Sequence, residues 1–521
     1  MNLRSVCSKS PSKDDLQVPA RRRGRPKGSR STPVRSSGDI AEIGQDSFPH
    51  IPVELWKQLT EATALFMRTL GAELEAAYTQ GIEAEMVNLL DEALPDAALA
   101  LGRATMEALA TQERGFHGTT IYCHACCGCL EYQGDVKKTL KTRIGNISPR
   151  RAYYHGSCGH SAAPMDMLIG VNGIHAVMPS LQDTVAWLTA SMSYPEVVKL
   201  LDRLCPSKFS LKGVETITAT VARQVEEAVL QEGAASFQNG YDDSLLPGAA
   251  VVEVDGGFVL VRDHTEPSRE FKLGVLGRLA DATPRHCSAI PGEVDRGVKL
   301  VEKSFVGHFA DPDIVFSGIQ AEYRRRGLDK LKIFHGISDG GAWIMPRMPF
   351  LAEEGQEISL VLDWWHADER LAEASNTLQG AGTEAAGEWR ANVRSDLWYG
   401  RLDEFFSKLE QAVLDGKTVK ARRELKGQHA YFAARRHLLR YQECRNRGLP
   451  IGSGAIEGGI RFIGKDRLNR SGMRWNIRGA EAILQLRCVK YSDRWKDLAE
   501  KRVAKRARFY RDARASWYGA A

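Results

Sequence analysis

A series of short apolar runs in the middle of the chain constrains its fold more than any other feature. The runs are Val251–Val254, Phe258–Val261, Phe271–Leu279, Leu331–Ile337 and Ile358–Leu362. Short runs rich in Val, Ile, Leu and Phe, bounded by turn residues, indicate buried strands. Apolar residues at three- and four-residue steps on either side of this region indicate helices. The sequence therefore predicts an α/β (α+β) protein with a mixed sheet in its middle part.

Changes of composition divide the 521 residues into segments. Residues 1–50 are poor in apolar residues and rich in Pro, Ser, Gly and Arg, so we expect a disordered basic N-terminus. The further expected segments are helical at 51–115, zinc-ribbon-like at 116–170, helical and helix-turn-helix-like at 171–240, sheet-forming at 245–366, helical at 367–447, and a last part of the core with basic C-terminal helices at 448–521.

The net charge of +6 is unevenly distributed. Residues 1–36 hold ten Lys or Arg and two Asp, and residues 487–515 hold eleven Lys or Arg and four acids. Basic ends on a mildly acidic body favour contacts with a polyanion, although a solubilising tail and a solvated helix would produce the same pattern. We see no apolar run of transmembrane length and no secretory signal, so we expect a cytoplasmic protein.

A basic motif lies near the N-terminus. Residues 21–30 are Arg-Arg-Arg-Gly-Arg-Pro-Lys-Gly-Ser-Arg, and a Gly-Arg-Pro core with cations on both sides resembles an AT-hook. Its extended backbone fits the narrow minor groove of A·T-rich DNA. We therefore expect Arg23, Arg25, Pro26 and Lys27 to bind DNA, with a generic basic or phosphorylatable linker as the alternative.

The cysteines predict a structural metal site. Four of the ten lie between residues 123 and 129, and Cys123-His124-Ala125-Cys126 is followed by His155-Gly156-Ser157-Cys158 at the same spacing. Two such pairs can surround a tetrahedral Zn²⁺ that stabilises a small ribbon. The expected ligands are Cys123, Cys126, His155 and Cys158, with Cys127, Cys129 and His160 as competing donors. Buried free cysteines are the alternative.

The segment Ser193–Arg223 has the pattern of helix, short turn, helix. Pro195 suits the first turn of a helix, and Ser210 suits the N-cap of a second one. A helix-turn-helix of this kind can place one helix in the DNA major groove. Two ordinary packed helices would give the same pattern, so both interpretations stay open.

Three acids follow apolar or glycine-rich stretches in a similar way. Asp255 and Asp339 each end an apolar run and precede two glycines, and Glu457 follows Gly452-Ser453-Gly454-Ala455. We expect Asp255-Gly256-Gly257 to form a tight turn between two strands. Carboxylates at strand ends can hold two divalent ions for phosphoryl transfer, and glycine permits close approach of a phosphate. Taken singly, each Asp-Gly is also a common turn.

Asp363 and His366 add a second signal, because they lie three residues apart after the run Ile358–Leu362. This spacing places a carboxylate and an imidazole on one turn of helix. We expect the pair to fix a strand-to-helix junction and to support an active site. We favour Asp339 over Asp363 as the second metal-binding acid, because Asp363 has its own role beside His366.

Cations are concentrated after Glu457, with Asp466 as the only acid among them. Such a segment beside a metal site suits phosphates, although a solvated helix face is the alternative. The residues expected to bind DNA are Lys465, Arg467, Arg470 and Arg474.

Taken together, these segments resemble a bacterial insertion-sequence transposase family of the DDE type, the Kra-four family. The matching stretches are Val254–Gly257, Ser338–Ile344, Leu362–Ala367, Gly448–Glu457, Arg467–Trp475 and Gly479-Ala480. The likeness covers roughly residues 115–500, and its C-terminal run is the most specific part. The zinc knuckles and the helix pair at Ser193 also resemble the N-terminal region of that family.

The resemblance implies an RNase H-like core at 245–366 and 448–521, interrupted by the helical insertion. It assigns Asp255, Asp339 and Glu457 to the catalytic metal triad, with Asp363 and His366 in support. Its implied cofactors are two Mg²⁺ (or Mn²⁺) per active site and a structural Zn²⁺. Gly458-Gly459 departs from the residues that usually follow this glutamate in the family, and we expect it to weaken the helix start.

The leading expectation is therefore a DNA transposase that hydrolyses and joins phosphodiesters at the ends of an insertion sequence. Its partners would be double-stranded DNA, namely the terminal inverted repeats and a target, and at least a second copy of the chain, because two ends must be brought together. A transposase-derived, non-catalytic DNA-binding protein and another RNase H-like nuclease, such as a junction resolvase, are the alternatives.

Overall fold

The computed structural model describes residues 49–81, 86–123, 125–171, 176–237, 245–263, 265–280, 283–286, 294–297 and 299–518. The chain divides into residues 1–57 and residues 58–521. The first unit is described only at residues 49–57, which include the start of helix α1 (Val53–Gln80). The expected AT-hook lies outside the described residues.

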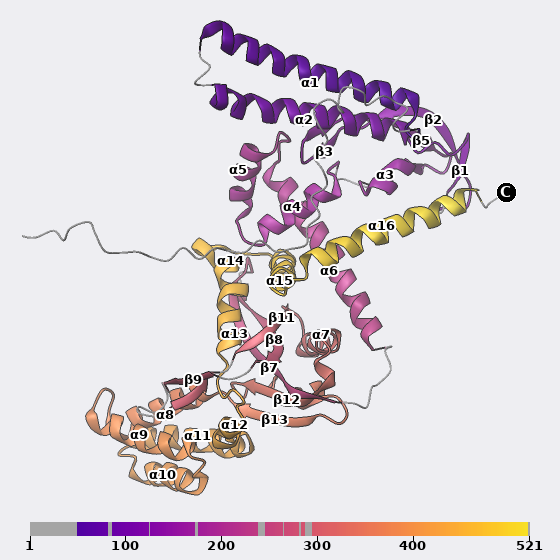
Figure 1. Cartoon of the computed structure of the whole chain (residues 1–521). Coiled ribbons are helices and arrows are strands. Elements are labelled where there is room, and N and C mark those ends of the chain that lie inside the picture. The colour runs from indigo at the N-terminus through magenta and orange to yellow at the C-terminus, as the bar shows by residue number, and fades with distance from the viewer. Residues whose placement is uncertain are drawn as a thin grey trace, which may run out of the picture. The chain divides into compact units, whose positions relative to one another are not determined.

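Helix α2 is followed by a small antiparallel module (Figure 1). Helix α2 spans Met86–Gln112. The elements that follow it are β1 (Thr120–Tyr122), β2 (Cys129–Lys137), β3 (Leu140–Thr142), β4 (Gly145–Ile147), β5 (Arg150–His155), β6 (Ser161–Ala162) and α3 (Pro164–Ile169). The strand order is β1-β2-β5-β6, and β3 pairs with β4. Strand alternation directs Ile121, Leu130 and Tyr154 into a core that Tyr510 of the last helix, α16 (Trp495–Tyr518), completes.

The next helices are α4 (Pro179–Thr189), α5 (Tyr194–Leu204) and α6 (Leu211–Ser236). The two helix starts expected for this segment are confirmed, because Pro195 lies in the first turn of α5 and Ser210 is the N-cap of α6. Ser193 forms a capping box with Glu196, and the side chain of Ser210 accepts a hydrogen bond from the backbone N–H of Gly213. These helices share one core with α15 (Ile477–Tyr491), so the helix pair is packed against the C-terminal part of the chain.

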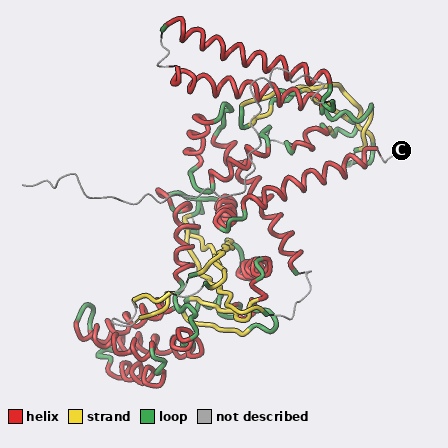
Figure 2. Tube along the Cα trace, viewed as in Figure 1, coloured by secondary structure: helices red, strands yellow, loops and turns green. Residues whose placement is uncertain are grey.

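The predicted mixed sheet is present (Figure 2). Its strands are β7 (Leu246–Leu260), β8 (Ser268–Leu279), β11 (Leu300–His308), β12 (Leu331–Ser338) and β13 (Glu357–Leu362). The order is β11-β8-β7-β12-β13. β7, β8 and β11 pair antiparallel, whereas β12 runs parallel to both β7 and β13. A separate two-stranded ribbon pairs β9 (Thr283–His286) with β10 (Val294–Gly297).

The prediction of a tight turn at Asp255-Gly256-Gly257 is wrong. Residues 246–260 form one continuous strand, in which Gly256 and Gly257 pair with Lys272 and Phe271 of β8. The two glycines allow close packing against neighbouring side chains and do not reverse the chain direction. A Cβ added to Gly257 would lie 2.6 Å from Phe271 Cε1 and 3.1 Å from Ile460 Cγ2.

The two faces of the sheet have separate apolar cores. On one face, Val252 and Val254 pack with helix α7 (Pro312–Arg325). On the other, Phe271 and Leu273 pack with α15 and with the segment around Ile460. Because side chains alternate along a strand, Glu253 and Asp255 of β7 belong to the second face.

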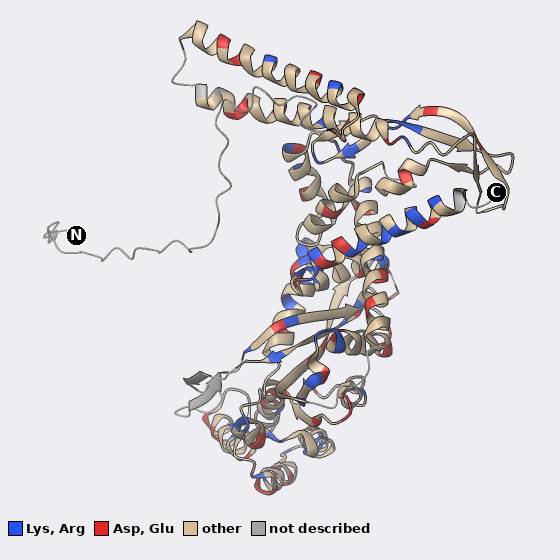
Figure 3. Ribbon diagram, turned by 45° about the vertical axis from the view of Figure 1, so that its right-hand side comes forward, with Lys and Arg blue, Asp and Glu red and all other residues tan. Residues whose placement is uncertain are grey.

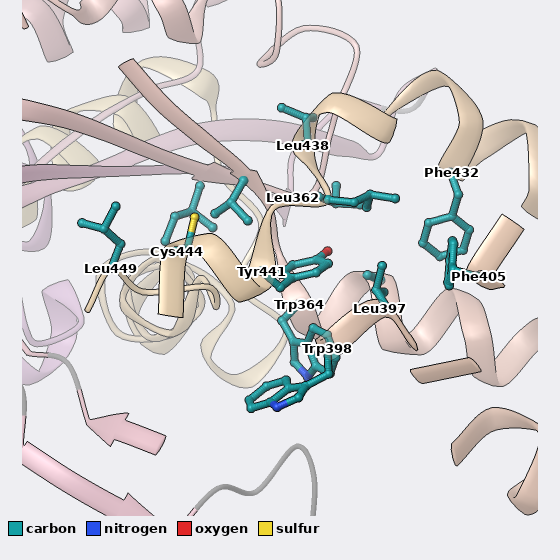
Figure 4. Close-up of a cluster of buried hydrophobic side chains, with 14 of the residues drawn as sticks. Leu362, Trp364, Leu397, Trp398, Phe405, Phe432, Leu438, Tyr441, Cys444 and Leu449 are labelled. Carbon is teal, nitrogen blue, oxygen red and sulfur yellow. The ribbon is translucent and has the colours of Figure 1, made fainter. Parts of the chain in front are cut away.

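The expected helical insertion is also present. It comprises α8 (Trp364–Gln379), α9 (Glu384–Trp398), α10 (Leu402–Asp415), α11 (Val419–Ala434) and α12 (Tyr441–Asn446). Trp364 lies edge-on to Trp398 and Tyr441, with ring centroids 5.1 and 4.9 Å apart (Figure 4). These rings share a core with Leu362 at the end of β13, so the insertion is anchored on the sheet.

After the insertion the chain returns to the sheet through α13 (Gly454–Gly459), a π-helical segment (Ile460–Lys465) and α14 (Asp466–Leu468). Gly458 and Gly459 are the last two residues of α13, which begins before them at Gly454. Gly459 lies against the sheet, where an added Cβ would come within 3.2 Å of Leu273 Cδ2. In the part of the chain that is described, no helix is both long and apolar enough to cross a membrane.

Candidate active site

Strand register brings three carboxylates to one level of the sheet. Ile337 of β12 pairs with Glu253 of β7, so Asp339, two residues further on, lies level with Asp255. Ser338 pairs with Leu362 of β13, so Asp339 also lies level with Asp363. Because the three strands run parallel, the acids lie side by side across the sheet, with Asp255 inside β7 and with Asp339 and Asp363 directly after the ends of β12 and β13.

Asp363 and His366 form a buried hydrogen-bonded pair, as expected from their spacing. Asp363 is fully buried at the N-cap of α8, and its Oδ2 accepts from the backbone N–H of His366 at 2.9 Å and from His366 Nδ1 at 2.7 Å. Its Oδ1 accepts from the backbone N–H of Ser453 at 2.6 Å. The carboxylate raises the pKa of His366 to about 9, so the imidazole is cationic at neutral pH.

Glu457 comes from α13, whose N-terminus is held by acids of the sheet. Ser453 has no side-chain capping bond; its backbone N–H donates to Asp363. The backbone N–H of Ile456 donates to Glu253 Oε2 at 2.8 Å. The Glu457 side chain is exposed at the site, and partial burial together with nearby Asp363 raises its pKa.

Glu253 is a site residue that the sequence prediction missed. Its side chain is 1% exposed, and burial raises its pKa to about 7. The signal was a single acid inside the apolar run Val251–Val254, where a solvated carboxylate has no place.

A group of possible metal ligands at this site differs from the expected triad. Ligand atoms of Asp363, His366 and Glu457 lie within 4.8 Å of one another, whereas Asp255 and Asp339 fall outside this group. Both oxygens of Asp363 are already used in hydrogen bonds, which suits a supporting role. By contrast, Asp255 Oδ1 accepts a hydrogen bond from the backbone N–H of Gly256 at 2.7 Å, and Asp339 Oδ1 accepts one from the backbone N–H of Gly341 at 2.8 Å.

The charge of the site fits a divalent cation. Burial, and then the nearby charge of Asp339, raise the pKa of Asp255 to about 6. Among residues 245–263 and 299–518, no Lys or Arg forms an ion pair with Asp255, Asp339 or Glu457. The acids outnumber His366, the one nearby cationic side chain named above, so the carboxylates repel one another, and oxygen donors of this kind suit Mg²⁺ or Mn²⁺.

Two residues of the insertion, Tyr431 and Arg435, contact the loop that follows β12. Tyr431 Oη donates to the Asp339 carbonyl at 2.9 Å, and Arg435 Nη2 donates to the Gly340 carbonyl at 2.8 Å. Gly340 has φ +78°, and an added Cβ would lie 2.9 Å from Arg435 Cδ. These residues line a cavity of about 260 Å³ together with His366. Tyr431 and Arg435 could not be predicted as site residues, because residues 367–447 show only helical periodicity.

The cysteine cluster forms with a different histidine. Cys123, Cys126, Cys158 and His160 come together as possible ligands of one ion, with Cys158 Sγ 3.4 Å from His160 Nδ1. His155 is not in the group. His155 is the last residue of β5 and follows the buried Tyr154. Because side chains alternate along a strand, the exposed side chain of His155 points away from the core. Its Nδ1 lies 2.9 Å from Ser161 Oγ.

Of the four cations expected to bind DNA in the last segment, three are exposed and one is buried. Lys465 and Arg474 are exposed, and Arg470 is half-exposed beside Glu196. Arg467 is 1% exposed. Its Nε donates to the Thr189 carbonyl at 3.0 Å, and its guanidinium lies 5.0 Å from the ring centroid of Trp475. The prediction that Arg467 binds DNA is therefore wrong, because its buried guanidinium instead connects α14 to the end of α4 at Thr189.

Comparison with known proteins adds no assignment. No protein-family model matches the chain, and no curated protein matches it significantly. The chemistry of the site is therefore inferred from its own residues.

Proposed function

We propose that this protein is a DDE-type DNA transposase of the Kra-four family, which performs metal-dependent hydrolysis and strand transfer at the ends of an insertion sequence. The observation that carries the proposal is the common level of Asp255, Asp339 and Asp363 across three parallel strands, with Glu457 brought beside Asp363 by α13.

The topology supports an RNase H-like core. An antiparallel series β7-β8-β11 is followed by α7 and by two strands added parallel beside β7, giving the order β11-β8-β7-β12-β13. The first acid then comes from the first strand, the second from the end of the next parallel strand, and the glutamate from a later helix. The insertion between β13 and α13 agrees with the interruption that the family resemblance implies.

Asp255, Asp339 and Glu457 would hold the divalent ions. Two such ions supply activation of the attacking oxygen and stabilisation of the leaving oxygen in phosphoryl transfer. Asp363 fixes α13 and His366, and the cationic imidazole of His366 offers a donor to a phosphate oxygen beside the acids. Glu253 fixes the backbone next to Glu457.

The remaining modules would serve assembly on DNA. Cys123, Cys126, Cys158 and His160 would bind a structural Zn²⁺, which leaves no open position for catalysis. Lys465, Arg470 and Arg474, together with the helix pair α5–α6, would contact DNA, and the active complex would contain at least two copies of the chain.

The test is incubation of the purified protein with Mg²⁺ and duplexes that end in the DNA flanking its gene. The proposal predicts cleavage at the element end and a joined product with target DNA. Preference for branched duplexes over these ends would instead indicate a junction nuclease, and binding without any cleavage would indicate a non-catalytic DNA-binding protein.

A further inference from the structure

A second cavity, of about 300 Å³, lies among α4, α6 and α16 and shares no residue with the acidic site. Its charged and polar lining residues include Arg143, Ser180, Asp183, Glu500, Arg502 and Arg506. Three of these are arginines, and α16 carries basic residues along its length (Figure 3).

Arg502 is buried with an incomplete set of hydrogen bonds. Its side chain is 8% exposed, and its Nη2 donates to Asp183 Oδ1. Its Nη1 has no acceptor among the described residues. A buried guanidinium N–H without an acceptor is costly, so Arg502 keeps unsatisfied donor capacity in the wall of the cavity.

Arg506 adds a second cation to the cavity wall, and it has no ion-pair partner of its own among the described residues. The other carboxylate oxygen of Asp183 accepts from Trp495 Nε1 at 2.9 Å, so both oxygens of this acid are in use. Across the described residues, neither Arg506 nor Arg143 forms an ion pair. Glu500 also lines the cavity, but its side chain is exposed.

The position of Arg506 is fixed against the start of α4. A Cβ added to Gly170, which has φ +74°, would lie 2.6 Å from Arg506 Cδ and 3.1 Å from Pro179 Cγ. Pro179 is the first residue of α4, an 11-residue helix without a side-chain cap. The positive end of the helix dipole and the arginines therefore act in the same place, and anions bind at such helix starts.

We propose that this cavity is a binding site for a phosphate group, formed by Arg143, Arg502, Arg506 and the N-terminus of α4. Guanidinium groups match phosphate oxygens in geometry and charge. The phosphate is either part of a DNA backbone or a free phosphate anion. The site does not depend on the metal chemistry proposed above.

The first experiment titrates the full-length protein with inorganic phosphate by calorimetry, without added divalent metal. The test variant is Arg143→Gln/Arg506→Gln, which leaves the buried Arg502–Asp183 pair intact. The control, Arg508→Gln/Arg511→Gln, removes the same charge from exposed positions of α16 that do not line the cavity. We expect wild type and control to bind alike, and the test variant to bind about tenfold more weakly or worse.

Arg143→Gln alone is the second variant, because Arg143 is exposed and its replacement does not threaten folding. We expect a partial loss of phosphate affinity. If wild type binds no phosphate, or if wild type, test variants and control bind it equally, the proposal is wrong.

A second measurement identifies the source of the phosphate. The affinity for a labelled duplex is followed against salt concentration by fluorescence anisotropy. If the occupant is a backbone phosphate, the test variant binds the duplex more weakly and its salt slope falls by about one per lost contact, relative to the control. If the affinity and slope for DNA are unchanged while phosphate binding is lost, the occupant is a free anion.

Discussion

The buried carboxylate of Glu253 accepts a hydrogen bond from the backbone N–H of Ile456, 2.8 Å away. This bond joins the strand that carries Asp255 to the helix that carries Glu457. The sequence separates the two residues by the whole insertion, yet each lies within two positions of a proposed metal ligand. The geometry of the site therefore depends on an acid that does not itself belong to the proposed triad.

The first prediction concerns this bond. Glu253→Ala should leave the Ile456 N–H without its acceptor and destabilise the fold by about 1–3 kcal/mol. Glu253→Gln keeps an oxygen acceptor and should remain close to wild type in stability. Urea unfolding measures both. In DNA cleavage, the alanine variant should lose turnover while its DNA affinity is retained. Equal turnover in the alanine and glutamine variants would show that the bond does not position Glu457.

The second prediction separates the two histidines of the cysteine module. His160→Ala should lower the bound zinc, because it removes a ligand, whereas His155→Ala should retain the wild-type zinc content. Metal analysis after dialysis against a mild chelator measures the difference. Loss of zinc from His155→Ala but not from His160→Ala would reverse the assignment.

The third prediction follows from His335, which lies fully buried in β12. The Pro450 carbonyl is 2.7 Å from its Nε2 and Ser359 Oγ is 3.0 Å from its Nδ1, so the neutral ring donates through Nε2 and accepts at Nδ1. Burial lowers its pKa from 6.5 to about 4. The native state therefore resists protonation, and its stability should fall as the pH drops from 6.5 towards 4, by up to about 1.4 kcal/mol per pH unit.

The measurement is urea unfolding of wild type and His335→Gln between pH 4 and 7. The variant cannot titrate, so it should lack this part of the pH dependence although it is less stable at pH 7. Parallel pH profiles for the two proteins would contradict the assignment.

The fourth prediction tests the support that the insertion gives to the Asp339 loop. Gly340→Ala combines a left-handed backbone position with a clash against Arg435 and Leu362, at a cost of about 1–3 kcal/mol. Tyr431→Phe removes the bond to the Asp339 carbonyl without a clash. Both should slow cleavage without weakening DNA binding. Gly387→Ala in α9, where an added Cβ meets nothing within 4 Å, is the matched control and should behave as wild type.

Local patterns predicted the strands around Asp339 and Asp363 because each of these acids directly follows a short apolar run. They failed at Asp255, where Asp-Gly-Gly is typical of a turn and only pairing with β8 shows that the chain continues. The common level of the acids depends on strand register, which sequence alone does not specify. Arg467 was expected to bind DNA because it belongs to a run of cations, and a run of charges does not show which of its members is buried, as Arg467 is beside Trp475.

The most direct measurement is the rate of Mg²⁺-dependent cleavage of element-end DNA by Asp255→Asn, Asp339→Asn and Glu457→Gln. Asp403→Asn is the control, because Asp403 is exposed on α10, outside the site. We expect a loss of about a hundredfold or more for each of the three variants, with zinc content and DNA affinity retained and the control fully active. Cleavage at the wild-type rate by any of the three would contradict its place in the metal site, and wild-type rates for all three would refute the proposed active site.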